Sequence, residues 1–363
     1  MSANDIDLPL QGICVLDLSR LLPGPVASLR LAQMGARVIK IEQPGDGDYA
    51  RAIGPIKNKV SQFFVAINHD KEFLRLDLKT AAGRDEFLAL VAKADVVLES
   101  FRPGVMEKLG LAWPVLREVN KSLVMCAISG YGMDGPFAQL AGHDLNYIAM
   151  SGMLQQNAGP DGVPAIPNLQ IGDLLGGAQQ AVQGILAALL AVKMGGTGRF
   201  VDISMTDGVL ANNIMPRVAV SAHGVSAPAG RDLLTGGVPC YNVYRTADLR
   251  YIAVGALELK FWEGVCDVLQ RPDLRTQHWM CGQKIGGEAA LALIAELGAI
   301  FAQHTLAYWS ARFESVDCCV TPVLTMEEAL VHPLFAARKI VARAEHPSEG
   351  SYWQSASGIQ FKA

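Results

Sequence analysis

The chain has 363 residues, of which half are hydrophobic and 18% are charged, a composition that excludes a disordered or low-complexity protein. The net charge of -4 leaves no basic excess, so we do not expect nucleic acid to be a partner. Seven cysteines occur without a C-x-x-C pair or a Cys/His cluster at metal-ligand spacing, which predicts reduced thiols and no metal site.

Neither a secretory signal nor a membrane-spanning segment is predicted. The first ten residues, MSANDIDLPL, contain two aspartates and no apolar core. The longest apolar run, Ile185–Val192, is too short to cross a bilayer. We therefore expect a cytoplasmic protein without a membrane partner.

The N-terminal part begins with a β-α-β pattern. Gly12–Ser19 predicts a buried strand, the turn LLPGP leads into a helix that ends at Gly35, and Val38–Glu42 predicts a second strand. A Gly-Pro turn before a helix is a favourable anion site, because the first helical N–H groups are free there. An ordinary strand-to-helix turn has the same pattern.

The alternation of strands and helices continues to about residue 222. Further strands are predicted over 72–80, 95–100 and 122–132, a buried helix over 178–192, and a strand leading into a helix over 201–215. Such alternation predicts an α/β fold with a doubly wound, mostly parallel, Rossmann-like sheet. Ligands of these sheets bind at the C-terminal ends of the strands.

The composition changes after residue 222. Small and flexible residues over 223–237 predict a linker, and the alternating pattern over 238–258 predicts a β-hairpin. Helical patterns follow. We predict a large domain over 1–222, a smaller inserted α+β domain over 223–325 with its linkers, and a return to the large domain over 326–363.

The stretch Gly142–Gly177 contains the side chains most suited to catalysis. It opens with GHDLNYIAMSG, which contains His143, and it closes with LQIGDLLGG, in which Asp173 precedes Gly176 and Gly177. An imidazole and a carboxylate beside glycines are typical of proton transfer at a carbonyl compound. Taken alone, the histidine has a structural interpretation, and the aspartate is a good N-cap.

Several motifs resemble the class III CoA-transferase superfamily: VLDLSRLLPGPVASLRLAQMGARVIKIEQPGDGD, ADVVLESFRPGVMEKLGL, GYGMDGP and GDLLGG. Others resemble its 2-methylacyl-CoA racemase branch: GHDLNYIAMSG, GGVPCYNVYRTADLRYIAVGALELKFW and FESVDCCVTPVL. The resemblance implies a CoA-binding large domain, a smaller inserted domain and an interlinked homodimer. Two places depart from the superfamily: the loop TGRFVD is shorter than its usual TG(K/R)GQxxD, and the chain stops at GIQFKA without a longer tail.

The same resemblance implies roles for individual residues. Asp173 matches the acidic residue of both branches, which is a covalent acyl carrier in transferases and a proton acid/base in racemases. His143 matches the other catalytic residue of the racemases, and Glu258 matches a glutamate that pairs with this histidine. Asp144 matches a residue near the pantetheine or the catalytic centre.

Inverting the α-carbon of a 2-methylacyl-CoA requires a proton to leave one face and another to return on the opposite face. Two acid/base groups suffice, so we expect His143 and Asp173 to act without a cofactor. Glu258 would orient the imidazole. The thioester oxygen gains negative charge, and the N–H groups over Leu174–Gly177 are predicted to stabilise it.

The CoA part of the substrate needs its own contacts. The residues predicted to make them are Asp144, Gly172, Gly176, Gly177, Arg51 and Lys40. Arg20 and Arg102 also follow predicted strands and are less favoured candidates for the phosphates, since basic residues in such places are commonly only solvated.

Three functions fit these residues. The first is cofactor-independent racemisation of a 2-methyl-branched acyl-CoA, which the set of His143, Asp173 and Glu258 favours. The second is a class III CoA-transferase that moves CoA between carboxylic acids through an Asp173 anhydride and thioester. The third is a non-catalytic acyl-CoA-binding protein. The acyl chain stays open between a sterol side chain, a branched fatty acid and a short aryl-propionate.

Overall fold

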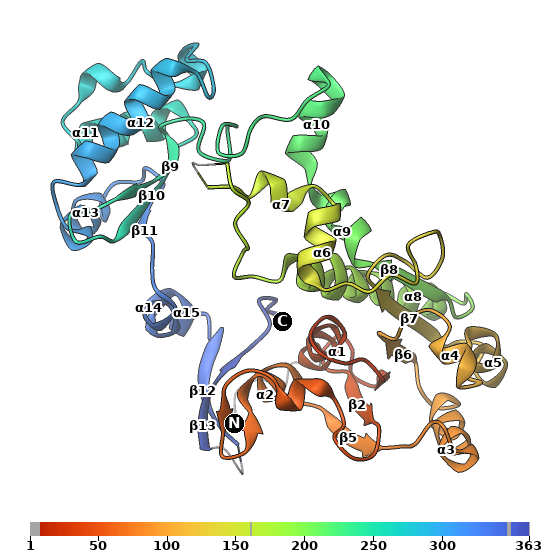
Figure 1. Cartoon of the computed structure of the whole chain (residues 1–363). Helices are drawn as coiled ribbons and strands as arrows, with labels where there is room; N and C mark the ends of the chain where they lie inside the picture. The colour runs from red at the N-terminus through yellow and green to blue at the C-terminus, as the bar shows by residue number, and fades with distance from the viewer. Residues whose placement is uncertain (1–7, 160–161, 347–349, 363) are drawn as a thin grey trace. The chain divides into compact units, whose positions relative to one another are not determined.

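The computed structural model describes residues 8–159, 162–346 and 350–362 (Figure 1). The chain forms two compact units. Unit 1 contains the chain up to residue 153, 167–213 and the part from residue 333 onward, and unit 2 contains 154–166 and 214–332. The chain thus first enters the smaller unit at residue 154, within the predicted large domain. It enters again at 214 rather than at the predicted 223, and leaves at 332 rather than 325.

Unit 1 is built on a six-stranded sheet in which every pairing is parallel. Its strands are β1 (Cys14–Asp17), β2 (Arg37–Glu42), β5 (Glu72–Arg75), β6 (Val96–Glu99), β7 (Val124–Ser129) and β8 (Phe200–Ser204). Their spatial order is β5-β2-β1-β6-β7-β8, which is 3-2-1-4-5-6 by position in the chain. This is the doubly wound order, so the predicted fold class is confirmed. The order reverses between β1 and β6.

Helices cover both faces of this sheet. On one face, α1 (Pro23–Gln33) and α8 (Gln180–Lys193) pack with the side chains of Val96 and Leu98. On the other face, α3 (Ala81–Val91) and α5 (Trp113–Val119) pack with Val97. Because neighbouring side chains of a strand point to opposite faces, each strand contributes to both cores.

Shorter elements complete unit 1. They are the 3₁₀ turn η1 (Tyr49–Ala52), the strand pairs β3 (Ile56–Lys57) with β4 (Val60–Ser61) and β12 (Val341–His346) with β13 (Gly350–Ser355), and the helices α2 (Gln62–Asn68), α4 (Val105–Lys108), α6 (Asp144–Met150), α9 (Met205–Asn212) and α15 (Pro333–Ala337). Helix α7 (Met153–Gln156) lies where the chain passes between the units. The antiparallel pair of β12 and β13 was not predicted.

The helix predicted to begin after Gly177 begins earlier. A π-helical segment, Gly172–Gln179, runs directly into α8. A Cβ atom on Gly176 would lie 2.2 Å from the carbonyl oxygen of Met205, and one on Gly208 would lie 2.5 Å from that of Gly176. The glycines therefore let this segment touch α9 at backbone distance. By length and composition the whole helix, 172–193, could cross a membrane, but 44% of its most apolar window is buried inside the fold.

Unit 2 has its own sheet and core. Strands β9 (Tyr241–Arg245), β10 (Tyr251–Gly255) and β11 (Val320–Pro322) form an antiparallel sheet in the order β11-β10-β9. The predicted hairpin is β9 and β10. The helices are α10 (Ile214–His223), α11 (Leu259–Val268), α12 (Glu288–Phe301), α13 (Leu306–Phe313) and α14 (Met326–Val331). The buried rings of Trp262, Phe301 and Trp309 lie in the core of this unit.

Candidate active site

A cavity of about 490 Å³ opens in unit 1 beside the point where the strand order reverses. The segments that follow β1, β6 and β7 form its walls, as expected for a doubly wound sheet. Its lining includes Arg20, Leu21, Pro23, Tyr49, Ser100, Phe101, Arg102, Pro103, Ser129, Gly130, His143, Asn146, Tyr147, Asp173 and Met205. Both predicted bases, His143 and Asp173, therefore face one cavity.

His143 precedes the first turn of α6, where its backbone is extended. Its N–H group donates a hydrogen bond to Oδ1 of Asn146 at 3.0 Å, which starts the helix at the next residue. The Tyr147 hydroxyl donates to the carbonyl oxygen of Gly142 at 2.5 Å. The backbone on both sides of His143 is thus held, and the exposed imidazole is left at the cavity wall.

Asp173 lies in the first turn of the π-helical segment, and its N–H group donates to Oδ1 of Asp144 at 3.0 Å. A Cβ atom on Gly172 would lie 3.0 Å from that oxygen and 3.2 Å from Cβ of Tyr147, so glycine allows this close approach to α6. Burial, and secondly the Asp144 carboxylate, raise the pKa of Asp173 to about 7. A carboxyl group with this pKa can both accept and donate a proton at neutral pH.

The structure changes the predicted contacts of the thioester oxygen. The N–H group of Leu174 donates to the Gln170 carbonyl at 2.9 Å, so the first of the four predicted donors is already used. Gly172, Gly176 and Gly177 are buried between helices, and none of the three lines the cavity. In the structure these glycines allow close packing of helices, and their predicted contact with CoA stays a prediction.

The two basic residues favoured for the phosphates are not at the cavity. The Lys40 side chain is fully buried and forms an ion pair with Asp48, with 3.0 Å between Nζ and Oδ2. Arg51 forms two hydrogen bonds to the Glu42 carboxylate, at 2.9 and 2.6 Å, and its guanidinium stacks on the Phe64 ring. Both cations have carboxylate partners inside the fold.

Arg20 and Arg102 line the cavity instead. The signal that would have found them is their position in the chain. Both stand in loops after the C-terminal ends of strands, whereas Lys40 stands inside a strand whose last five residues are all buried. A parallel strand is covered on both faces, so a charged residue within it needs a buried partner.

Glu258 belongs to unit 2, where it directly precedes α11 and is exposed to solvent. His143 belongs to unit 1. Because the two residues belong to different units, the pairing of Glu258 with His143 stays a prediction.

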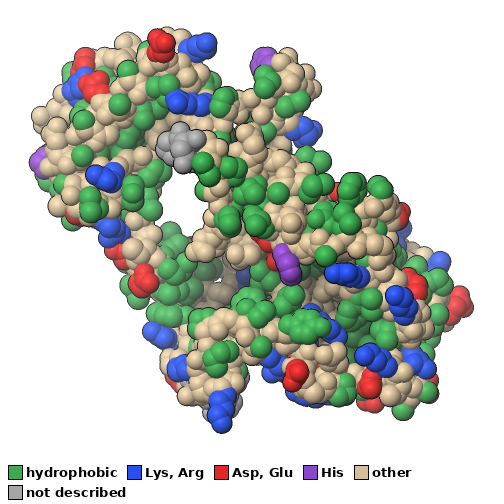
Figure 2. Space-filling view, viewed as in Figure 1, with side chains coloured by type: hydrophobic (Ala, Val, Ile, Leu, Met, Phe, Trp, Pro, Cys, Tyr) green, Lys and Arg blue, Asp and Glu red, His purple; other side chains and the backbone are tan. Residues whose placement is uncertain are grey.

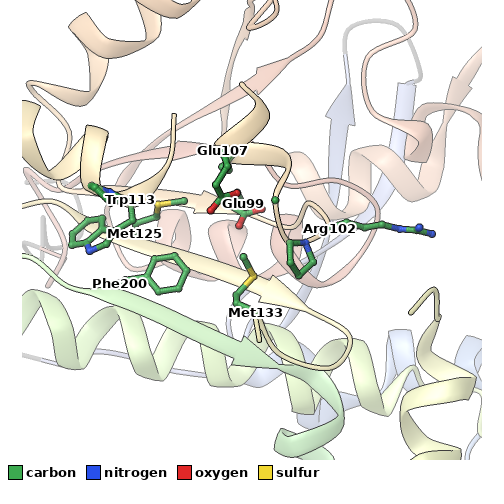
Figure 3. A pocket seen from close by; sticks show the side chains of 11 residues that line it. Glu99, Arg102, Glu107, Trp113, Met125, Met133 and Phe200 are labelled. Carbon is green, nitrogen blue, oxygen red and sulfur yellow. The ribbon is translucent and has the colours of Figure 1, made fainter. Parts of the chain in front are cut away.

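A second, smaller cavity of about 280 Å³ lies against β6 and β7 and shares Arg102 and Pro103 with the first (Figure 3). In Figure 3 the carboxyl groups of Glu99 and Glu107 point toward one another, and Arg102 extends away from them. Burial raises the pKa of Glu99 to about 8, so this carboxyl group carries a proton at neutral pH. Neither predicted base lines this cavity. Within the described parts of the chain, no group of three or more His, Cys, Asp or Glu side chains could hold a metal ion.

Comparison with known proteins assigns the chain to a family. The profile of CoA-transferase family III matches residues 10–363. The chain belongs to this family. Its sequence is 36% identical over 329 residues to the alpha-methylacyl-CoA racemase of Homo sapiens, covering 90% of this chain and 80% of that protein. It is 34% identical over 337 residues to the acetyl-CoA:oxalate CoA-transferase of Acetobacter aceti, covering 93% and 86%.

The fold of CoA-transferase family III is also found among solved structures. A CaiB/BaiF family protein from Brucella suis matches with a TM-score of 0.83 and 26% identity, covering 97% of this chain and 92% of that protein. The resemblance drawn from the motifs is therefore confirmed at the level of the family. Racemases and transferases within it are both similar to this chain, so the chemistry depends on the site.

Proposed function

We propose that this protein is a cofactor-independent racemase of 2-methyl-branched acyl-CoA thioesters, with His143 and Asp173 as the two bases. The observation that supports this most is that an imidazole and a carboxyl group with a pKa near 7 line the same cavity. One group must accept a proton while the other donates one, and imidazoles also titrate near neutral pH. A transferase needs only the carboxylate.

The reaction would proceed through an enolate. The deprotonated base removes the α-proton, and the electrons of the C–H bond move into the thioester, whose oxygen becomes negative. The protonated group on the other face then returns a proton to the same carbon. Because burial raises the pKa of Asp173 to about 7, this carboxyl group can be the donor of that proton at neutral pH. Glu258, which the motifs pair with His143, would orient the imidazole.

We place the CoA phosphates near Arg20 and Arg102, because these guanidinium groups line the cavity that contains the bases. A guanidinium recognises phosphate oxygens through paired N–H groups. Asp144 would act through its hydrogen bond to the Asp173 backbone rather than by contact with CoA.

We also propose a cytoplasmic homodimer of the interlinked kind that the motifs imply. Hydrophobic side chains are exposed on α6 and around the π-helical segment of unit 1. The space-filling view shows exposed hydrophobic side chains spread over the visible face of the chain (Figure 2). Leu145 and Met150 of α6 are 41% and 59% exposed, and Leu169 and Leu175 are 58% and 39% exposed. Apolar groups of this size beside a site are commonly covered by a partner.

The alternative is CoA transfer through Asp173, and a trapping experiment separates the two. In a transferase the Asp173 carboxylate attacks the thioester carbonyl and releases CoA thiolate, which leaves a mixed anhydride that hydroxylamine converts into a hydroxamate. We expect Asp173 to stay unmodified when the protein, 2-methylacyl-CoA and hydroxylamine are mixed, as judged by peptide mass spectrometry. A hydroxamate at Asp173 would contradict the racemase and support the transferase.

A further inference from the structure

The segment Ser19–Leu21 follows β1, and its residues Arg20 and Leu21 line the cavity. Leu21 has a φ of 63°, in the left-handed region that residues other than glycine rarely adopt. Such a conformation persists only where the surrounding structure holds it. The contacts that hold this one come from the interior of unit 1.

A buried ion pair forms hydrogen bonds to the backbone of this segment on both sides of Arg20. The Lys40 ammonium donates to the carbonyl oxygen of Ser19 at 2.8 Å, and Oδ1 of Asp48 accepts from the N–H group of Leu21 at 3.0 Å. The two side chains are 0% and 1% exposed. A third contact comes from the residue that follows β6, because the N–H group of Arg20 donates to Oγ of Ser100 at 3.0 Å.

The ion pair is itself fixed in place. Oδ1 of Asp48 also accepts from the N–H group of Ala50, and the N–H group of Asp48 donates to Oε1 of Glu42, both at 2.9 Å. Glu42 is in turn paired with Arg51. Lys40 and Arg51, which the sequence suggested as phosphate ligands, thus belong to one network beneath the cavity wall.

The network ends at the Arg20 guanidinium. This group lies 5.4 Å from the centre of the Tyr49 ring and 5.3 Å from that of the Phe101 ring. It donates to the Tyr49 hydroxyl at 3.3 Å and to Oε1 of Gln43 at 3.1 Å. Tyr49 directly follows Asp48. The Asp48 carboxylate therefore fixes the position of the Arg20 backbone and also that of the Tyr49 ring beside the guanidinium.

We propose that the buried Lys40–Asp48 ion pair is a positioning device that holds Arg20 toward a phosphate group of the CoA thioester. The proposal rests on the proposed function, because it requires CoA in this cavity. A purely structural role is the competing explanation. Replacing a buried ion pair by apolar residues often leaves stability unchanged, so the geometry imposed on Arg20 is the property to test.

A double-mutant cycle with free CoA as the ligand tests the proposal. Calorimetry would give the Kd of CoA for Asp48→Asn, Lys40→Met and Arg20→Met, and for each of the first two combined with Arg20→Met. We expect each single variant to raise the Kd by roughly tenfold, because a displaced guanidinium loses its phosphate contacts. In the Arg20→Met background, the other two substitutions should raise it no further.

Phe87→Leu is the matched control, because Phe87 is fully buried in α3 and lies outside the network. It should lower the thermal stability and leave the Kd unchanged. Lys40→Met keeps the contacts of Asp48 with the N–H groups of Leu21 and Ala50, so it carries the test if Asp48→Asn does not fold.

Three results would overturn the positioning role. The effects of Asp48→Asn and Arg20→Met could add, only Arg20→Met could weaken binding, or Phe87→Leu could weaken it as much as Lys40→Met does. A Kd that no variant changes, Arg20→Met included, would instead remove CoA from this cavity and contradict the proposed site itself.

Discussion

Replacing Asp173 by asparagine is expected to slow racemisation of a 2-methylacyl-CoA by about 10²- to 10⁴-fold, the usual contribution of one general acid or base. Asparagine keeps the size of the side chain and the backbone hydrogen bond to Asp144, but it cannot accept the α-proton. His143 would still remove a proton from one enantiomer and return one on the same face. That enantiomer should therefore exchange its α-hydrogen with deuterated water and keep its configuration.

Chiral chromatography and ¹H NMR of the same reaction measure the two rates separately. Asp85→Asn is a suitable control, because Asp85 is an exposed carboxylate on α3 away from the cavity. Its racemisation rate should equal that of the unmodified protein. Undiminished racemisation by Asp173→Asn would show that Asp173 is not a base.

Replacing His143 by alanine is expected to slow racemisation by a similar factor. Asp173 should still exchange the α-hydrogen of one enantiomer with solvent on a single face of the α-carbon. Only the deprotonated carboxylate accepts a proton, so this residual exchange should rise as the pH passes through about 7 and then level off. In the active form of the unmodified protein, one of the two groups is protonated and the other is deprotonated. Racemisation should then follow a bell-shaped pH profile.

The same variant separates the two chemistries of the family. A transferase uses Asp173 alone as its acyl carrier, so it would keep its CoA transfer activity after His143→Ala. His223→Ala is the control, since His223 is an exposed histidine of α10 in unit 2. Full racemisation by His143→Ala would contradict the two-base mechanism.

The sheet of unit 1 could be predicted because its strands are short apolar runs separated by amphipathic helices. The boundary between the two units was harder to predict from the sequence. Helix α10, Ile214–His223, has an apolar pattern that continues from α9, yet none of its residues is buried and it groups with unit 2. The early start of the long helix was also missed. In a sequence, glycines such as Gly176 are commonly taken to indicate a turn. In this structure they instead permit contact between the backbones of two helices.

The motifs pointed to two residues, His143 and Asp173, that the structure brings to one cavity, whereas the favoured basic residues, Lys40 and Arg51, do not line it. His143 and Asp173 each start a helix, and these helix starts meet because Gly172 has no side chain. The preference for Lys40 over Arg20 disregarded their positions in the chain. Lys40 stands within a covered parallel strand and is buried against Asp48, a partner that only the fold brings to it, whereas Arg20 follows a strand and lines the cavity.

We propose that this cavity moves a proton rather than an acyl group. Its most direct test is to dissolve a single enantiomer of a 2-methyl-branched acyl-CoA with the protein in deuterated water, without any free carboxylic acid, and to follow the α-hydrogen by ¹H NMR. We predict that the α-hydrogen signal disappears and that the product becomes racemic. An unchanged signal and configuration, with CoA passing to a carboxylic acid added afterwards, would contradict the account.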